Sequence, residues 1–119
     1  MPPRRTAIGV PRDPALLEDL RAEFRQLTAD AVAEVWNFLD EIGLHGAEAA
    51  DCVATLNHRV VVIVREVAGV AVVIASNEDD NSLTLVAVST VVPQRRAALY
   101  RCARALGLDV DHEHYSGNP

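Results

Sequence analysis

The chain has 119 residues, half of them hydrophobic, and a formal net charge of −6. This length suits one domain that buries its own core. The acidic balance argues against nucleic-acid binding, because an acidic surface repels the phosphate backbone. All eleven basic residues are arginines, which excludes a lysine Schiff base and a P-loop lysine.

The cysteines and the apolar runs indicate a cellular compartment. Cys52 and Cys102 are far apart, without CxxC spacing, and the N-terminus lacks the apolar stretch of a signal peptide. No apolar run reaches the roughly 20 residues of a transmembrane helix. We therefore expect a cytoplasmic protein with two reduced, buried thiols and no membrane association.

Residues 1–13 are rich in proline and arginine and show no periodicity, so we predict a flexible arm. A sharper hypothesis makes this arm a partner-binding segment. In its nucleic-acid form, which the net charge disfavours, Arg4, Arg5 and Arg12 would contact phosphates.

The next segment has the pattern of an amphipathic helix. Asp13 can cap a helix that begins at Pro14, and Gly43 suits its C-terminal end. We predict one long helix over residues 14–42, with a break near Thr28–Asp30 as the alternative. The pattern consists of apolar side chains at every third or fourth position: Leu16, Leu20, Phe24, Leu27, Ala31, Val35, Phe38 and Ile42.

The middle of the chain has the composition of a sheet. Twelve of the seventeen valines lie between Val60 and Val92, and β-branched residues favour strands. We predict strands over residues 59–65, 70–76 and 82–92, with turns at Gly69 and over residues 77–81. Such short connections require an antiparallel meander. Residues 46–56 fit either helix or strand.

A second helix is predicted from Pro93 to Gly107, followed by a short edge strand over 108–115 and a tail over 116–119. The fold class is therefore α+β, with one domain over residues 14–115. The order helix, meander, helix is similar to that of small chaperone and adaptor folds. This similarity concerns element order alone and carries no function.

The predicted sheet is apolar on both faces. In the strand over 59–65, for example, Val60, Val62 and Val64 alternate with Val61 and Ile63. Both faces must be shielded, because soluble monomers rarely expose a large apolar patch. Helices of the same chain could share the two faces, or one face could be left for a second copy. We expect a homodimer.

The start of the helix after Pro93 is the candidate anion site. Arg95 and Arg96 lie where the helix dipole is already positive, and Val92 offers no capping oxygen. A bound phosphate would reverse this unfavourable arrangement. The plainer interpretation is ion pairing with the acidic first helix, which includes Glu23.

The other candidate sites have weak signals. His112 and His114 alternate with acidic residues near the C-terminus, but the spacing matches no metal motif. Cys52 with His45 or His58 has no spacing that activates a thiol. Trp36 has helical spacing, which is typical of a core residue. We assign no catalytic, cofactor or metal-binding residue and expect no cofactor.

The favoured hypothesis is a non-catalytic homo-oligomeric interaction module, adaptor-like or chaperone-like, whose partners are a second copy and another protein. The alternative is a small anion-binding protein or enzyme that uses Arg95 and Arg96. The sequence favours the first but does not exclude enzyme activity.

Overall fold

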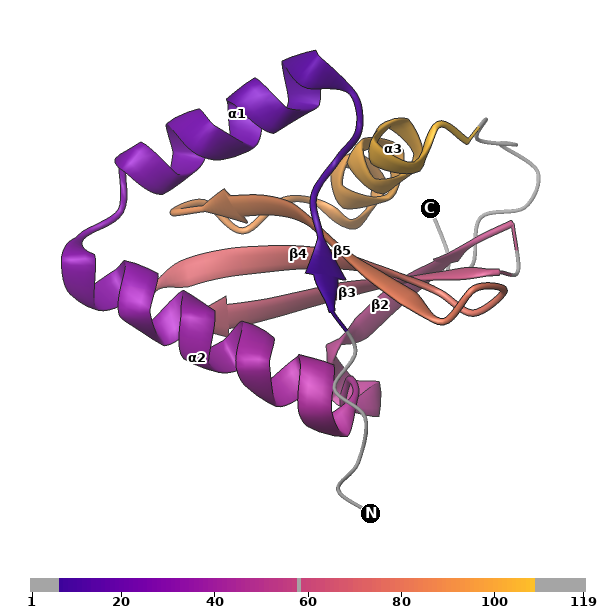
Figure 1. The fold of residues 1–119 in the computed structure, drawn as a ribbon, viewed down its shortest axis with the longest axis horizontal. Helices are drawn as coiled ribbons and strands as arrows, with labels where there is room; N and C mark the ends of the chain where they lie inside the picture. The colour runs from indigo at the N-terminus through magenta and orange to yellow at the C-terminus, as the bar shows by residue number, and fades with distance from the viewer. Residues whose placement is uncertain (1–6, 58, 109–119) are drawn as a thin grey trace.

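A five-stranded sheet lies between helices in the computed structural model, which describes residues 7–57 and 59–108 (Figure 1). The strand order is β1-β5-β4-β3-β2, antiparallel except for β1, which runs parallel to β5. The predicted α+β class is confirmed. The elements are β1 (Ile8–Gly9), α1 (Pro14–Arg25), α2 (Ala29–His45), the 3₁₀ turn η1 (Ala49–Asp51), β2 (Cys52–Leu56), β3 (Val60–Val67), β4 (Val70–Asn77), β5 (Ser82–Ser89) and α3 (Arg95–Leu106).

The predicted long helix is two helices, α1 and α2, which form a V (Figure 1). Asp13 caps α1 by accepting from the Ala15 N–H at 2.9 Å, as expected. Thr28 caps α2 by accepting from the Ala31 N–H at 3.1 Å. The threonine hydroxyl satisfies a backbone donor that a continuous helix would have paired internally, so the break was the correct alternative. The second helix ends at Gly46, one turn beyond the predicted Gly43.

The meander has four strands, because residues 52–56, whose structure the sequence left undecided, form β2. Ala68 and Gly69 connect β3 to β4, both with positive φ of 51° and 77°. This is the geometry of a two-residue turn whose twist matches the flanking strands. Between β4 and β5 the register shifts so that Val73 faces Ala87 and Ile74 faces Leu85. Val86 therefore has no opposite residue and bulges into the core.

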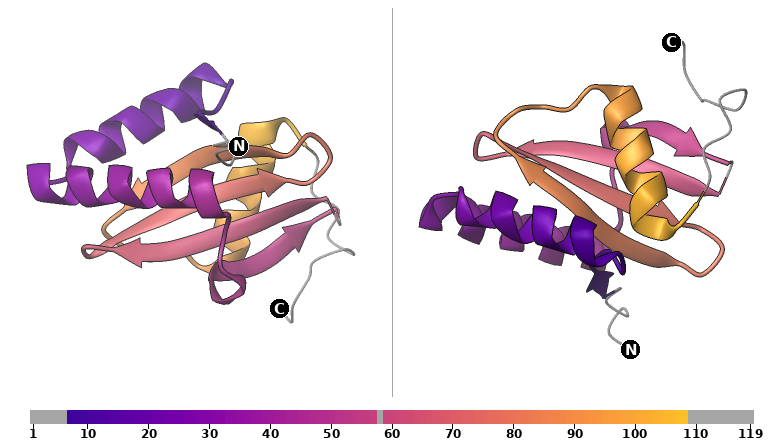
Figure 2. Two further views of the ribbon diagram at one scale, coloured as in Figure 1. Left: turned by 60° about the horizontal axis from the view of Figure 1, so that its bottom comes forward. Right: turned by 90° about the horizontal axis from the view of Figure 1, so that it is seen from above.

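Helices of the same chain cover both faces of the sheet (Figure 2). On one face α2 packs on Ile63, Val72 and Ile74, and on the other α3 packs on Val62 and Val73. All five of these side chains are at most 1% exposed. The expectation that one face is left for a second copy is therefore wrong, and the dimer prediction loses this support.

Helix α1 lies along the β5 edge and contributes to both cores. Leu16 joins the core under α3, and Leu20, one turn later, joins the core under α2. Residues four apart share one side of a helix. That side of α1 lies across the edge of the sheet, so one short helix places side chains in the cores on both faces.

The two ends of the chain differ from the predictions in different ways. Ile8 and Gly9, placed by prediction in a flexible arm, pair with Leu83 and Thr84 of β5, and Pro11 is buried. A two-residue strand has too few residues to show a period, so no pattern in the sequence indicated it. The predicted edge strand over 108–115 lies outside the described residues from Asp109 onward.

Candidate interaction surfaces

An aromatic pair, Phe24 of α1 and Trp36 of α2, joins the two helices. The rings of Phe24 and Trp36 stack with centroids 6.0 Å apart and planes 19° apart. Phe24 is half-buried, whereas the Trp36 residue is 55% exposed. The prediction that Trp36 is a core residue is wrong. Val35 faces the sheet, and the next residue of a helix is turned by about 100°, which directs Trp36 toward α1.

The exposed carboxylates of α2 lie on more than one side of the helix, since Glu34 and Glu41 line a hollow with Phe38 and Arg65, turned away from Trp36. Helix α2 carries four exposed carboxylates and no arginine, and Asp40 lies one turn after Trp36. On α1, the exposed Arg21 pairs with Glu18 at 3.3 Å. The acidic side chains of α2 are Asp30, Glu34, Asp40 and Glu41.

One half-buried ion pair joins α1, β5 and α3. Arg101 donates from Nη1 to Glu23 Oε2 at 2.8 Å and from Nη2 to Oε1 at 2.6 Å. Glu23 Oε1 also accepts from the Val88 N–H at 3.4 Å. Arg101 Nε is buried without a hydrogen-bond partner among the described residues. Pairing between the last helix and the acidic first helix was predicted, but through Arg95 or Arg96 rather than Arg101.

The predicted anion site lies at the start of α3, where Arg95 and Arg96 are both exposed. The N-cap is Gln94 rather than Val92, and it makes no side-chain hydrogen bond to the helix. The start of α3 therefore has no side-chain cap, as the sequence indicated. The hypothesis that it binds an anion stays a prediction.

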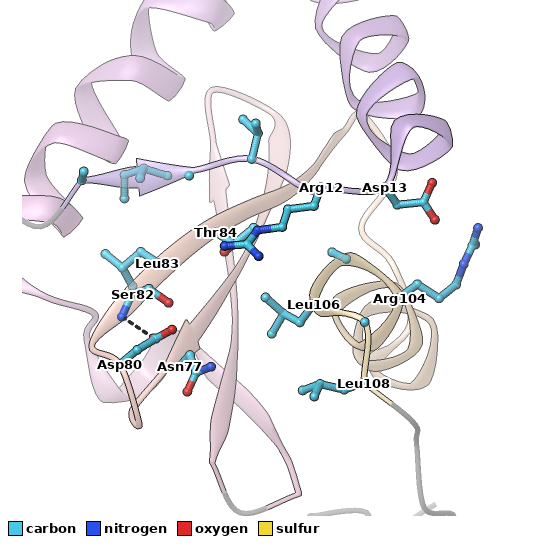
Figure 3. Close-up of a pocket in the computed structure, with 16 residues that line it drawn as sticks. Arg12, Asp13, Asn77, Asp80, Ser82, Leu83, Thr84, Arg104, Leu106 and Leu108 are labelled. Carbon is cyan, nitrogen blue, oxygen red and sulfur yellow. Dashed lines mark hydrogen bonds between the residues drawn. The ribbon is translucent and has the colours of Figure 1, made fainter.

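A hollow of about 670 Å³ lies between β1, the start of β5 and the end of α3 (Figure 3). The Arg12 guanidinium lies beside Thr84 and faces Leu106, whereas Arg104 points away. The Asp80 carboxylate is engaged by the Ser82 N–H at 3.1 Å. The described lining residues include the Arg12 guanidinium, the hydroxyls of Ser82 and Thr84 and the carboxylates of Asp13 and Asp80. These groups can bind a small polar molecule, but no histidine or thiol lies among them to serve as a base or a nucleophile.

The two thiols are free but differ in exposure. Cys102 is fully buried, as predicted, and burial raises its pKa to about 12. Cys52 is exposed, so the prediction for it is wrong. Partial desolvation of the thiol and the neighbouring Asp51 carboxylate raise the pKa of Cys52, and the thiol donates to the Glu48 carbonyl at 3.5 Å. Both effects keep the thiol protonated, which opposes a role as nucleophile.

We expect one thiol per chain to react with Ellman's reagent in the native protein and two in guanidinium chloride. The Cys102 thiol ionises at pH 9.0 in its ordinary environment and at about 12 in the native protein. Between these values the unfolded chain has lost a proton that the native protein retains. The free energy of unfolding should therefore fall as the pH rises from about 9 toward 11. Chemical denaturation of Cys102→Ala should show a shallower fall, and an equal slope would contradict the assignment.

The remaining candidates gain no support. Among residues 7–57 and 59–108, no group of three or more His, Cys, Asp or Glu side chains could hold a metal ion. His58, His112 and His114 lie outside the described residues, and His45 is exposed. No helix within the described part of the chain is long and apolar enough to cross a membrane.

Comparison of the chain with protein-family models, with curated proteins and with solved structures found no match.

Proposed function

We propose that the protein is a non-catalytic homo-oligomeric interaction module, adaptor-like or chaperone-like, which holds a segment of another protein beside Trp36. The exposure of Trp36 carries the proposal. Tryptophan is enriched among the residues that dominate binding energies, and Trp36 is 55% exposed although it is a large aromatic residue. Stacking on Phe24 fixes the indole before a partner arrives, which lowers the entropy lost on binding.

The charge of α2, where Asp40 lies one turn after Trp36, indicates the chemistry of the partner segment. Four carboxylates and no arginine lie on α2, and the whole chain has a net charge of −6. A segment with one large apolar side chain and flanking basic residues would complement this surface. We therefore propose a basic, apolar-anchored segment as the occupant.

The test is a selection of random peptides displayed on phage against the immobilised protein. We expect the enriched peptides to combine an aromatic or aliphatic residue with arginine or lysine. Their affinity for Trp36→Ser should fall by about thirtyfold, the loss typical of a central binding residue. Because Trp36 is the only tryptophan, its fluorescence should also shift as each peptide binds.

The matched control is Val91→Ser, which removes an apolar side chain that is 71% exposed elsewhere on the surface. It should bind the selected peptides as tightly as the parent does. Peptides that bind Trp36→Ser with parental affinity would refute the proposed surface.

A further inference from the structure

The hollow between β1, β5 and the end of α3 is lined by a buried hydroxyl. Leu83 and Leu85 of β5 join the core beneath α2, so Thr84 between them faces the side of the sheet that α3 covers. Thr84 is only 9% exposed, and its hydroxyl makes no hydrogen bond within residues 7–57 and 59–108. Buried polar groups are nearly always hydrogen-bonded. An unpaired hydroxyl that lines a hollow therefore points to a polar ligand.

The Arg12 guanidinium lies beside this hydroxyl (Figure 3) and forms no ion pair with a described residue. Two carboxylates also line the hollow, but both are engaged by backbone N–H groups. Asp13 accepts from the Ala15 N–H at 2.9 Å, and Asp80 accepts from the Ser82 N–H at 3.1 Å. The Arg12 and Asp13 side chains leave the backbone in opposite directions (Figure 3). The cation and the hydroxyl are thus placed to act on one ligand.

We propose that this hollow binds a small monocarboxylate with an apolar chain. A carboxylate can accept two parallel hydrogen bonds from one guanidinium, and the Thr84 hydroxyl can donate another. A doubly charged phosphate is disfavoured, because Asp13 and Asp80 carry like charge at the same hollow. The apolar chain lies against Leu106 and Leu108. The volume of about 670 Å³ falls within the roughly 300–1,000 Å³ of small-molecule sites.

The site goes beyond the proposed function and does not depend on it. It lies between the β1 edge and the C-terminal end of α3, whereas Trp36 stacks on α1 from α2. It also differs from the anion site predicted at Arg95 and Arg96, which lie at the opposite end of α3. Any one of the three can therefore fail without the others.

The experiment is a titration of the isotopically labelled full chain with hexanoate, followed by the NMR shifts of backbone amides. We expect the amides of Gly9, Thr84 and Leu106 to shift together with one dissociation constant. Hexanol has the same chain without the charge, and inorganic phosphate has charge without the chain. Each should bind at least about tenfold more weakly than hexanoate.

Two variants test the residues that hold the carboxylate. Arg12→Ala should weaken hexanoate binding at least about tenfold, because it removes both charge-assisted bonds. Thr84→Val removes the hydroxyl and keeps the shape of the side chain, so it should weaken binding about fivefold. Thr84→Val should be no less stable than the parent, since the hydroxyl makes no bond to a described residue. The matched control is Arg95→Ala, an exposed arginine outside the hollow, which should keep the parental affinity.

The outcomes that contradict the site are distinct. Unchanged amides at Gly9, Thr84 and Leu106 would overturn it, and this titration of the parent needs no variant to fold. Equal affinity for hexanol, or parental affinity in Arg12→Ala, would show that the guanidinium holds no carboxylate. Tighter binding of phosphate than of hexanoate would overturn the ligand class. None of these results changes the expected peptide binding at Trp36.

Discussion

Replacing Val73 by aspartate should destabilise the protein as much as replacing Ile74 by aspartate does, although the two side chains lie on opposite faces of β4. Val73 is 1% exposed beneath α3, and Ile74 is 0% exposed beneath α2. An aspartate at either position buries an unpaired charge, so we expect the free energy of unfolding to fall by about 4 kcal/mol or more. Single domains have only about 5–15 kcal/mol to lose.

Urea denaturation followed by circular dichroism measures both variants, and Val91→Asp is the control. Val91 is 71% exposed, so its replacement should change the free energy of unfolding by no more than about 0.5 kcal/mol. If Val73→Asp kept the parental stability and changed only the oligomeric state, the face beneath α3 would be covered by a second copy. That result would contradict the arrangement in Figure 2.

Removing the Glu23 carboxylate should have the next largest effect. Glu23→Ala removes the acceptors of the hydrogen bonds that Arg101 donates from Nη1 and Nη2, in a site where the arginine side chain is 26% exposed. It also frees the Val88 N–H at the β5 edge. We expect a loss of about 2–3 kcal/mol, below the range for a fully buried pair because water reaches part of the site.

Two further variants separate the ion pair from general damage to α1. Arg101→Ala should cost a similar amount, and Glu23→Ala with Arg101→Ala together should cost less than the sum, because the two residues act on one contact. Arg21→Ala, which breaks the exposed pair with Glu18, should change the free energy of unfolding by less than about 0.5 kcal/mol. Strictly additive losses for Glu23 and Arg101 would show that the pair does not join α1 to α3.

The candidate surfaces were only partly visible in the sequence. Val35 and Trp36 are adjacent in one helix and cannot both face the sheet, so the helical period of the sequence was enough to predict that Trp36 is exposed. The pairing of Glu23 with Arg101 could not be predicted from the sequence, because the two residues are 78 positions apart. The same holds for the edge position of β2, since strand order depends on which strands meet in space.

The amino-acid sequence by itself determined the elements whose signals are local. Valine-rich apolar runs between turn signals set β3, β4 and β5 to within a few residues, and the Asp13 cap and the helical period set the start and the apolar stripe of α1. Only the tertiary structure decided how both apolar faces are shielded. Whether α1 and α2 form one straight helix or a V depends on packing against the sheet. Burying the apolar faces of both helices contributes more free energy than continuing the helix through residues 26–28 would. The parallel β1 strand has the same origin, since two residues fix no structure until β5 offers them partners.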